Sequence, residues 1–490
     1  MRNLSLALIV VFTLVAFSPV AAQQSVTAGP GQQPTQAPGS NRAGQSGGSL
    51  QTRGTSVVTG GLAVAGAAQV TSGPAALSLA QAIQLALQNN LTTLLARERR
   101  REAEGLKQEA RAGLLPNISG AAYQASLTQN LAALGFQPGT FPGISRTFIG
   151  PFNNFDARAR LVQNIFDLSA LKNYRAGRAG VRVAEFEEQL AREQVATGTA
   201  LTYLEALRAE RAVAAAEANV ELAQALVKLA EDQRGAGVAT GVDVTRAQTR
   251  LAEEQLRLAQ AQSLSEQARL NLQRIVGLAL ESPLTLTDEL RFTTEPTPTV
   301  ETAVAQAAQS RPELRIAEEE IRINELARQA VRAEQLPSLA FVGDYGVSGI
   351  TPTNTALPTR RAALQLNVPI FNGGLTRGRE AVAASRTRQA ELALGNVRGQ
   401  VEEDARLALS AVRTAVAQVR AADESVNLAQ RELEMARDRF RAGVADNLEV
   451  VNAQTALANA RDAQVTALAQ YNGARLNLAA ALGRATSFRW

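Results

Sequence analysis

Residues that could do chemistry are scarce in this chain, because its 490 residues include no cysteine and no histidine. Their absence excludes thiol catalysis, disulfides, zinc sites built from Cys and His, and imidazole acid–base catalysis. No glycine-rich phosphate loop is present. The Glu and Arg residues lie three and four apart, a spacing typical of solvated helix faces rather than of a carboxylate site. We therefore expect no enzyme activity, no metal and no cofactor.

The balance of charge excludes one class of partner. The chain has 50 Lys and Arg residues against 45 Asp and Glu, a formal net charge of +5, with the two signs interspersed. Proteins that bind nucleic acid usually gather basic residues into a patch or stripe, so we expect no nucleic-acid partner. Aromatic residues are only 4% and alanine is frequent, which favours long, closely packed helices.

The N-terminus predicts export. Residues 1–22 have the form of a secretory signal peptide: Arg2 precedes an apolar stretch, Leu4–Phe17, and small residues follow at Val20–Ala22. An uncleaved anchor helix is the alternative. Residues 23–74 are rich in Gln, Gly, Ser, Thr and Pro and are predicted to form a disordered leader. No later run of about 18 apolar residues predicts a transmembrane helix.

The rest of the chain is a duplication, with a first repeat at residues 75–290 and a second at 291–490. Pro116 matches Pro337 at an offset of 221, whereas Gly277 matches Gly483 at an offset of 206. The two repeats therefore keep the same ends and differ mainly in the length of a middle loop.

Each repeat is predicted to begin with a helix, from about Ser78 to Leu115 and from Val300 to Leu336. Proline cannot continue a helix and biases the residue before it toward extended backbone. Pro116 and Pro337 therefore mark helix-to-strand junctions, and Pro369 marks the exit from the last strand.

Extended segments with alternating side chains follow each of these prolines. In the first repeat one face of a strand carries Ala121, Tyr123, Ala125 and Leu127, and the returning strand alternates Phe155, Ala157, Ala159 and Leu161 with Asp156, Arg158 and Arg160. In the second repeat Ala362, Leu364, Leu366 and Val368 share a face. Alternation over about ten residues is typical of transmembrane barrel strands, although a half-buried soluble sheet has the same period.

The longest elements are predicted helices at residues 167–234 and 375–441, each about 100 Å long at ~1.5 Å per residue. Apolar residues recur at every seventh position: Val412, Val419, Val426, Leu433 and Phe440, with Val213, Val220 and Val227 in the first repeat. Alanines recur with the same period: Ala209, Ala216, Ala223 and Ala230; Ala415, Ala422, Ala429 and Ala436; Ala453, Ala460, Ala467, Ala474 and Ala481. This rhythm predicts antiparallel coiled-coil hairpins whose helices lie unusually close.

A helix-breaking phrase, GAGVATGVD in the first repeat and RAGVADNLE in the second, marks the turn of each hairpin. Gly237 and Gly443 fit the left-handed position that closes a helix. Asp243 and Glu449 then stand three residues after Thr240 and Asp446, the spacing of a capping box at the start of the next helix.

Four strands cannot close a barrel, and an open sheet edge leaves amides without partners in lipid. Small barrels begin near eight strands, so two chains would supply eight and three would supply 12. The chain must therefore oligomerise, and its sequence leaves the number of copies open.

In this order of motifs the chain resembles the TolC family of outer-membrane efflux proteins, over about residues 75–483. The resemblance rests on the duplication, LSLAQAIQLALQNN, the junctions LLPNIS and LPSLAF, VPIFNGGLTRGR, and two AGV turns followed by AQT. It implies a mainly α fold in which coiled-coil hairpins form an α-barrel tunnel through the periplasm. Four strands per chain would join a trimeric, 12-stranded β-barrel in the outer membrane of a Gram-negative-type bacterium.

The resemblance also implies partners and site residues. The tube would export drugs, other toxic compounds or proteins, together with a periplasmic adaptor and an inner-membrane pump of RND or ABC type. The adaptor-docking ends correspond to six turn residues: Gly237, Val238, Ala239, Gly443, Val444 and Ala445. The constriction of the tunnel corresponds to Asp243, Glu449 and Asn452. Ala445 replaces a basic gate residue of some members, and the two carboxylates have helix capping as their alternative role.

Two other classes of protein compete with this interpretation. A periplasmic coiled-coil adaptor would carry one hairpin flanked by β-rich modules, whereas this sequence predicts two hairpins. A purely structural coiled coil would not explain the alternating strands and the proline junctions.

Overall fold

The computed structural model describes residues 65–67, 76–130, 132–134, 148–293, 296–353, 355–442, 444 and 447–489. All of them belong to one compact unit, Ser56–Trp490. The predicted signal peptide and most of the predicted leader lie outside the described residues. Residues 65–67, near the end of that leader, form backbone hydrogen bonds: Ala67 N donates to Arg274 O (2.9 Å) and Leu91 N donates to Gly66 O (3.3 Å).

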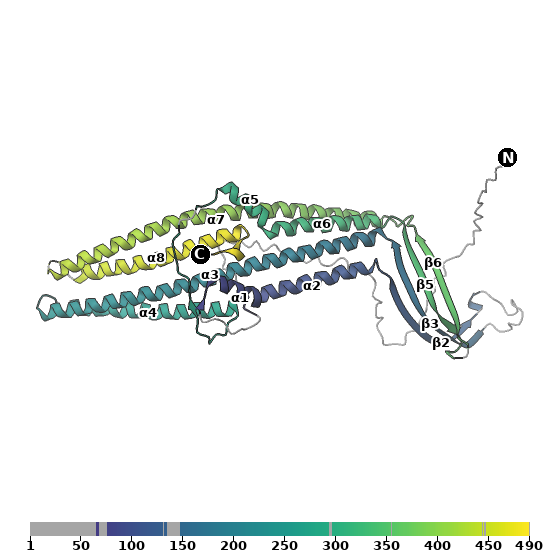
Figure 1. Ribbon diagram of the computed structural model, residues 1–490, viewed down its shortest axis with the longest axis horizontal. Helices are drawn as coiled ribbons and strands as arrows, with labels where there is room; N and C mark the ends of the chain where they lie inside the picture. Colours follow the sequence, from purple (N-terminus) through teal and green to yellow (C-terminus); the bar gives the residue numbers. More distant parts are fainter. Residues whose placement is uncertain are drawn as a thin grey trace. The chain divides into compact units, whose positions relative to one another are not determined.

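Two long helical hairpins dominate the fold (Figure 1). α3 (Leu168–Gly235) and α4 (Gly241–Val276) form the first hairpin, and α7 (Leu375–Arg441) and α8 (Asn447–Ala481) form the second. The predicted long helices are confirmed nearly to the residue. None of the helices in the described part of the chain is both long and apolar enough to cross a membrane.

The alanine seam is buried as its period predicts. In α8 all five alanines of the repeat, from Ala453 to Ala481, are buried, and so are those of α3 and α7. Val412, Val419, Leu433 and Phe440 are buried in α7, and Val426 is partly buried. Because alanine has no side chain beyond Cβ, the paired helices approach closely along this line.

The first helix of each repeat is interrupted, which corrects the prediction of one continuous helix. α1 (Leu79–Asn89) is separated from α2 (Leu91–Ala112), and α5 (Val300–Ser310) from α6 (Pro312–Ala333). At the first break Asn90 has extended backbone, and its side-chain oxygen accepts a hydrogen bond from Thr92 N (2.9 Å). At the second break Pro312 is the first helical residue and holds Arg311 out of the helical conformation.

The four predicted strands form one antiparallel sheet in the order β2–β3–β5–β6. Their bounds are Asn117–Asn130 for β2, Phe148–Phe166 for β3, Ser338–Gly349 for β5 and Leu357–Asn367 for β6. The central pairing of β3 with β5 joins the two repeats, with Ala159 opposite Tyr345. β2 and β6 are the two edges, and their outer amides have no strand partner among the described residues.

The register corrects the predicted apolar face of β2. Ala121 lies opposite Arg158 and Tyr123 lies opposite Asp156, so these apolar side chains share the charged side of the sheet. On β3 and β6 the prediction holds, because Leu161 and Ala362 both face Gly343 across β5 and lie on one side. The alternation of small residues in β2 was too weak to show which of its faces is apolar.

Three small elements that the sequence did not predict lie beside the helices. β1 (Ala76–Leu77) pairs in parallel with β4 (Thr285–Leu286). The buried Tyr203 hydroxyl of α3 lies 2.9 Å from Leu77 O and 2.8 Å from the Asp288 carboxylate. Near the C-terminus the Glu193 carboxylate accepts a hydrogen bond from Ala485 N (2.6 Å), which ties η2 (Ala485–Ser487) to α3. Another short turn, η1 (Ala132–Leu134), follows β2.

The helices pack as two strips that share α3 and α7. Beside the sheet the neighbours are α2, α3, α6 and α7, and beside the hairpin turns they are α4, α3, α8 and α7. The described part of one chain is therefore a sheet and a strip of helices, each with two open edges.

Candidate functional site

The turn of the first hairpin is built around a left-handed glycine. Gly237 has φ = 76°, and Val238 N and Ala239 N both donate to Gln233 O, at 2.9 and 3.2 Å. A residue with a Cβ is strained in this conformation, so glycine closes α3 at low energetic cost. This confirms the role predicted for Gly237. Gly443 and Ala445 in the second turn lie outside the described residues.

Apolar side chains are exposed at both turns. We call Val238, Val242, Val444 and Leu448 the apolar tip; their exposed fractions are 63%, 64%, 71% and 43%. The members correspond in pairs between the repeats, because Val238 matches Val444 and Val242 matches Leu448 at the offset of 206. Exposed apolar side chains at corresponding positions of both turns make these ends a candidate contact surface.

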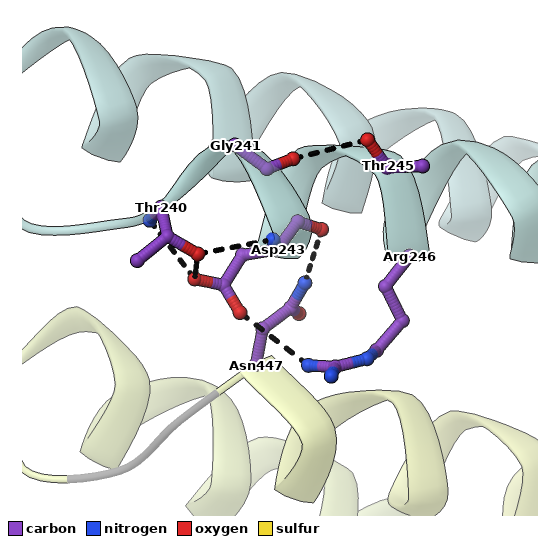
Figure 2. Close-up of polar contacts among 6 residues, drawn as sticks. All are labelled: Thr240, Gly241, Asp243, Thr245, Arg246 and Asn447. Carbon is purple, nitrogen blue, oxygen red and sulfur yellow. Dashed lines mark hydrogen bonds and ion pairs between the residues drawn. The ribbon is translucent and has the colours of Figure 1, made fainter.

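Asp243 starts α4 as a capping residue (Figure 2). Thr240 N donates to the Asp243 carboxylate (2.9 Å), and Asp243 N donates to the Thr240 hydroxyl oxygen (3.4 Å). The Thr240 hydroxyl also donates to the Asp243 carboxylate (2.7 Å). The Arg246 guanidinium forms an ion pair with the same carboxylate, with Nη1 3.4 Å from Oδ1. Hydrogen bonds from Thr240 hold the pKa of Asp243 below its usual value. The capping box predicted for this turn is therefore present.

One polar contact joins the two hairpins at their ends. The Asn447 side chain, only 1% exposed, donates from Nδ2 to the backbone oxygen of Asp243 (2.8 Å), as Figure 2 shows. A second contact runs between the long helices, where Gln233 Nε2 donates to Phe440 O (3.1 Å). The sequence analysis missed Asn447. A comparison of the two repeats could have drawn attention to it, because the corresponding residue in the first repeat is a glycine, Gly241.

An apolar cluster reinforces this junction below the turns. Leu226 of α3 is 3% exposed and packs in one cluster with Leu433 and Phe440 of α7 and Val450 and Leu457 of α8. The two hairpins of a chain are thus held together by side-chain packing along the helices and by hydrogen bonds at the ends.

The other predicted constriction residues lie at the start of α8. The Glu449 carboxylate is 3.3 Å from Arg439 Nε, and both side chains are substantially exposed, at 43% and 60%. Asn452 is exposed one turn further along. Asp243 thus contacts the second hairpin through Asn447. Glu449 instead forms an ion pair with Arg439 of α7, in its own hairpin.

The predicted junction prolines lie between elements. Pro116 stands between α2 and β2, Pro337 between α6 and β5, and Pro369 between β6 and α7. No group of three or more Asp and Glu residues in the described part of the chain is arranged to hold a metal ion.

Two antiparallel coiled-coil hairpins, joined through a repeated layout to one antiparallel sheet, define the fold of an outer-membrane channel. The family model of outer membrane efflux proteins matches residues 82–278 and 303–484, more than half of the chain. The chain therefore belongs to the outer membrane efflux protein family, whose members are channel-forming transport proteins. Its place is the outer membrane, and its function is that of an outer-membrane channel for efflux or secretion.

Two individual relatives resemble this chain in sequence, one over most of its length and the other over a smaller share. The pyoverdine export outer membrane protein OpmQ of Pseudomonas putida is 24% identical over 84% of this chain and 86% of OpmQ. The alkaline protease secretion protein AprF of Pseudomonas aeruginosa is 26% identical over 63% of this chain and 65% of AprF, which is less than two thirds of that protein.

Solved structures share the fold at low sequence identity. The CmeC outer membrane channel of Campylobacter jejuni has a TM-score of 0.72 and 19% identity, over 83% of this chain and 86% of that chain. The outer membrane protein VceC of Vibrio cholerae has a TM-score of 0.70 and 19% identity, over 83% and 96%.

Proposed function

We propose that three copies of this chain enclose one continuous export duct through the outer membrane and into the periplasm. The observation that carries the proposal is the pair of open sheet edges, β2 and β6. In hydrocarbon an unpaired backbone amide costs several kcal/mol, and a strand edge has many of them. Pairing β6 of one chain with β2 of the next satisfies both edges, and three copies give a closed barrel of 12 strands.

The helices support the same closure. α7 lies at one edge of both helical strips, and α2 and α4 lie at the opposite edges. Where β6 of one chain pairs with β2 of the next, α7 of the first chain packs against α2 and α4 of the second. The barrel and the helical wall therefore close together.

Cysteine trapping tests the number of copies, because the natural chain has no cysteine to interfere. Gly120→Cys on β2 is combined with single cysteines along β6, one at a time, and the protein is oxidised in outer membranes. We expect one register to give a covalent ladder that ends at three chains. A matched series with Ala159→Cys, on the inner strand β3, should give no ladder. A ladder that ends at two chains, or none in any register, would refute the trimer.

We further propose that the apolar tip docks the periplasmic adaptor, which connects the duct to an inner-membrane pump. Exposed valines at Val238 and Val444 suit packing against another apolar surface, whereas a free turn in water has no need of them. The cargo is then set by the pump. Relatives named for protease secretion and for pyoverdine export both match this chain, which fits a duct without a narrow specificity of its own.

The same ends would form the gate. We place Asp243, Glu449 and Asn452 around the periplasmic mouth, which opens when the α7–α8 hairpin moves away from the α3–α4 hairpin. In each chain this movement must break the hydrogen bond from Asn447 to Asp243. Glu449 supplies negative charge to the opening, because Arg439 only partly neutralises an exposed carboxylate.

A further inference from the structure

The register of the sheet places two adjacent arginines, Arg360 and Arg361, on opposite sides. Arg361 of β6 and Arg160 of β3 both stand opposite Asp344 of β5, so these three side chains lie on the charged side of the sheet. Successive side chains of a strand point to alternate sides, so Arg360 lies on the other side, directly opposite Tyr345. One of the two arginines is therefore separated from the charged residues of the sheet.

The side that carries Arg360 is otherwise apolar. Along β6 it continues with Ala362, Leu364 and Leu366, and the two leucines are 67% and 64% exposed. Strands of a transmembrane barrel turn their apolar residues toward lipid and their polar residues toward the lumen. In the barrel proposed above, on which this assignment rests, Arg360 therefore faces lipid and Arg361 faces the lumen.

Arg360 also lies near the end of the sheet that is far from the helices. β5 begins after α6 and β6 leads into α7, so the turn between the two strands is at the opposite end (Figure 1). Arg360 is three residues after Leu357, the first residue of β6, which is about 10 Å along the strand. Leu366 is six residues further toward the helices, or about 20 Å. With the helices in the periplasm, Arg360 stands at the outer boundary of the apolar band, at the depth of the outer headgroups.

No carboxylate of the strands or their turns is available to this arginine on the lipid side. Residues 117–166 and 338–368 contain five arginines but only two acidic residues, Asp156 and Asp344. Both carboxylates form ion pairs with Arg158 on the charged side of the sheet. Further copies of the chain bring the same strands and therefore add no acid to the lipid side. The anion that balances the arginine must come from outside the protein.

Tyr345 supplies a second polar group at the same depth. Residues directly opposite in an antiparallel pair have Cβ atoms about 5 Å apart, so the Tyr345 hydroxyl and the Arg360 guanidinium can reach one anion. On its other side Tyr345 stands opposite Ala159, whose side chain is small, and Tyr345 is 68% exposed. Tyrosine rings gather at membrane–water interfaces, and arginine side chains extend toward the headgroups there.

We infer that Arg360 and Tyr345 bind the phosphate of an outer-leaflet lipid, one lipid for each chain of the barrel. The planar guanidinium fork donates to two phosphate oxygens at once, and the phenol hydroxyl donates to a third. The acyl chains of the same lipid pack along Leu364 and Leu366 toward the middle of the membrane. This site is separate from the hairpin ends and from the strand amides that join neighbouring copies.

Native mass spectrometry of the detergent-purified full-length channel, incubated with the phosphorylated glycolipid lipid A, tests the inference. We expect one lipid adduct per chain in the natural protein. Arg360→Gln should weaken binding about tenfold, the order expected for a charge-assisted hydrogen bond. Tyr345→Phe, which removes only the hydroxyl, should weaken it about fivefold, the order expected for a neutral hydrogen bond.

Arg361→Gln is the matched control, because it removes the same charge from the adjacent position on the lumen side. We expect this variant to bind lipid A as tightly as the natural protein does. Equal weakening by Arg360→Gln and Arg361→Gln would overturn the assignment of the two sides. Full affinity in Arg360→Gln would overturn the role of Arg360 itself.

Two further probes distinguish a lipid from a free anion. Lipid A without its phosphates should bind about tenfold more weakly, because it loses the charge-assisted bonds. Inorganic phosphate should not displace lipid A, because it has no acyl chains to bury against the leucines. Undiminished binding of the dephosphorylated lipid, or full displacement by inorganic phosphate, would overturn the proposal.

The same spectra separate this site from the barrel on which it rests. Three chains without selective lipid adducts would contradict the lipid site alone. A number of chains other than three would contradict the proposed barrel instead.

Discussion

The hydrogen bond between the hairpin ends allows a sharp test of how the duct opens. The change is Asn447→Ala, which removes the amide that donates to Asp243 O at 2.8 Å. Asn447 is 1% exposed, so water does not readily replace the lost donor in the closed state. In the open state, with the hairpins apart, water can bind the Asp243 oxygen. The substitution therefore destabilises the closed mouth relative to the open one.

The size of the effect follows from the number of such bonds. A neutral intramolecular hydrogen bond contributes about 1 kcal/mol net. If three chains open together, the closed mouth loses about 3 kcal/mol, which corresponds to roughly a 150-fold shift in the equilibrium between closed and open states. Independent opening of each chain would give only about a fivefold shift per chain. The measured value thus also reports whether the mouth opens in a concerted way.

Single-channel recording in planar bilayers measures this shift as a change in open probability. The control is Asn459→Ala, which removes the same amide from an exposed position of the same helix. Native mass spectrometry checks that both variants keep the oligomeric state of the natural protein. An open probability unchanged in Asn447→Ala, or raised equally in both variants, would refute the role of this bond in closing the mouth.

Three further predictions concern the same ends. Val238→Asp combined with Val444→Asp places charge on the exposed apolar tip. We expect cells with this variant to lose drug or protein export while the amount of channel in the outer membrane stays normal. Normal export would refute docking of the adaptor at the apolar tip. Glu449→Gln should lower the preference for cations over anions in reversal-potential measurements, and an unchanged preference would favour the alternative that Glu449 acts only in capping its helix. The lowered pKa of Asp243 means that its stabilising effect is complete above the carboxyl pKa of the unfolded chain, near 4, and is lost as pH falls through the lower folded value. Thermal unfolding should therefore show a smaller acid-side loss of stability for Asp243→Asn than for the natural protein, and identical pH profiles would contradict this linkage.

Long-period patterns were enough to predict the two long helical hairpins. The alanine repeats extend over several heptads, so single irregular positions cannot change the predicted face, and all of these alanines are buried. Val213, Val220 and Val227 of the first repeat are only partly buried. The first turn was predictable for a local reason. Gly237 and the pair Thr240 and Asp243 specify their backbone through sterics and short-range hydrogen bonds.

The missed features depend on contacts between segments far apart in the sequence. The apolar face of β2 is fixed by its register with β3, and small residues such as Ala121 carry little information about which side they face. The bond from Asn447 to Asp243 exists only because two hairpins lie side by side. The helix break before Pro312, in contrast, could have been predicted locally, because a proline inside a helical pattern indicates a break.

The sheet has a consequence for the route by which the chain folds. Each hairpin closes through a short turn, whereas Ala159 reaches Tyr345 only after more than 180 intervening positions and a whole hairpin. Local helical contacts form quickly, and long-range strand pairing is slowed by the entropy of closing so large a loop. We therefore expect each helical hairpin to form before β3 pairs with β5.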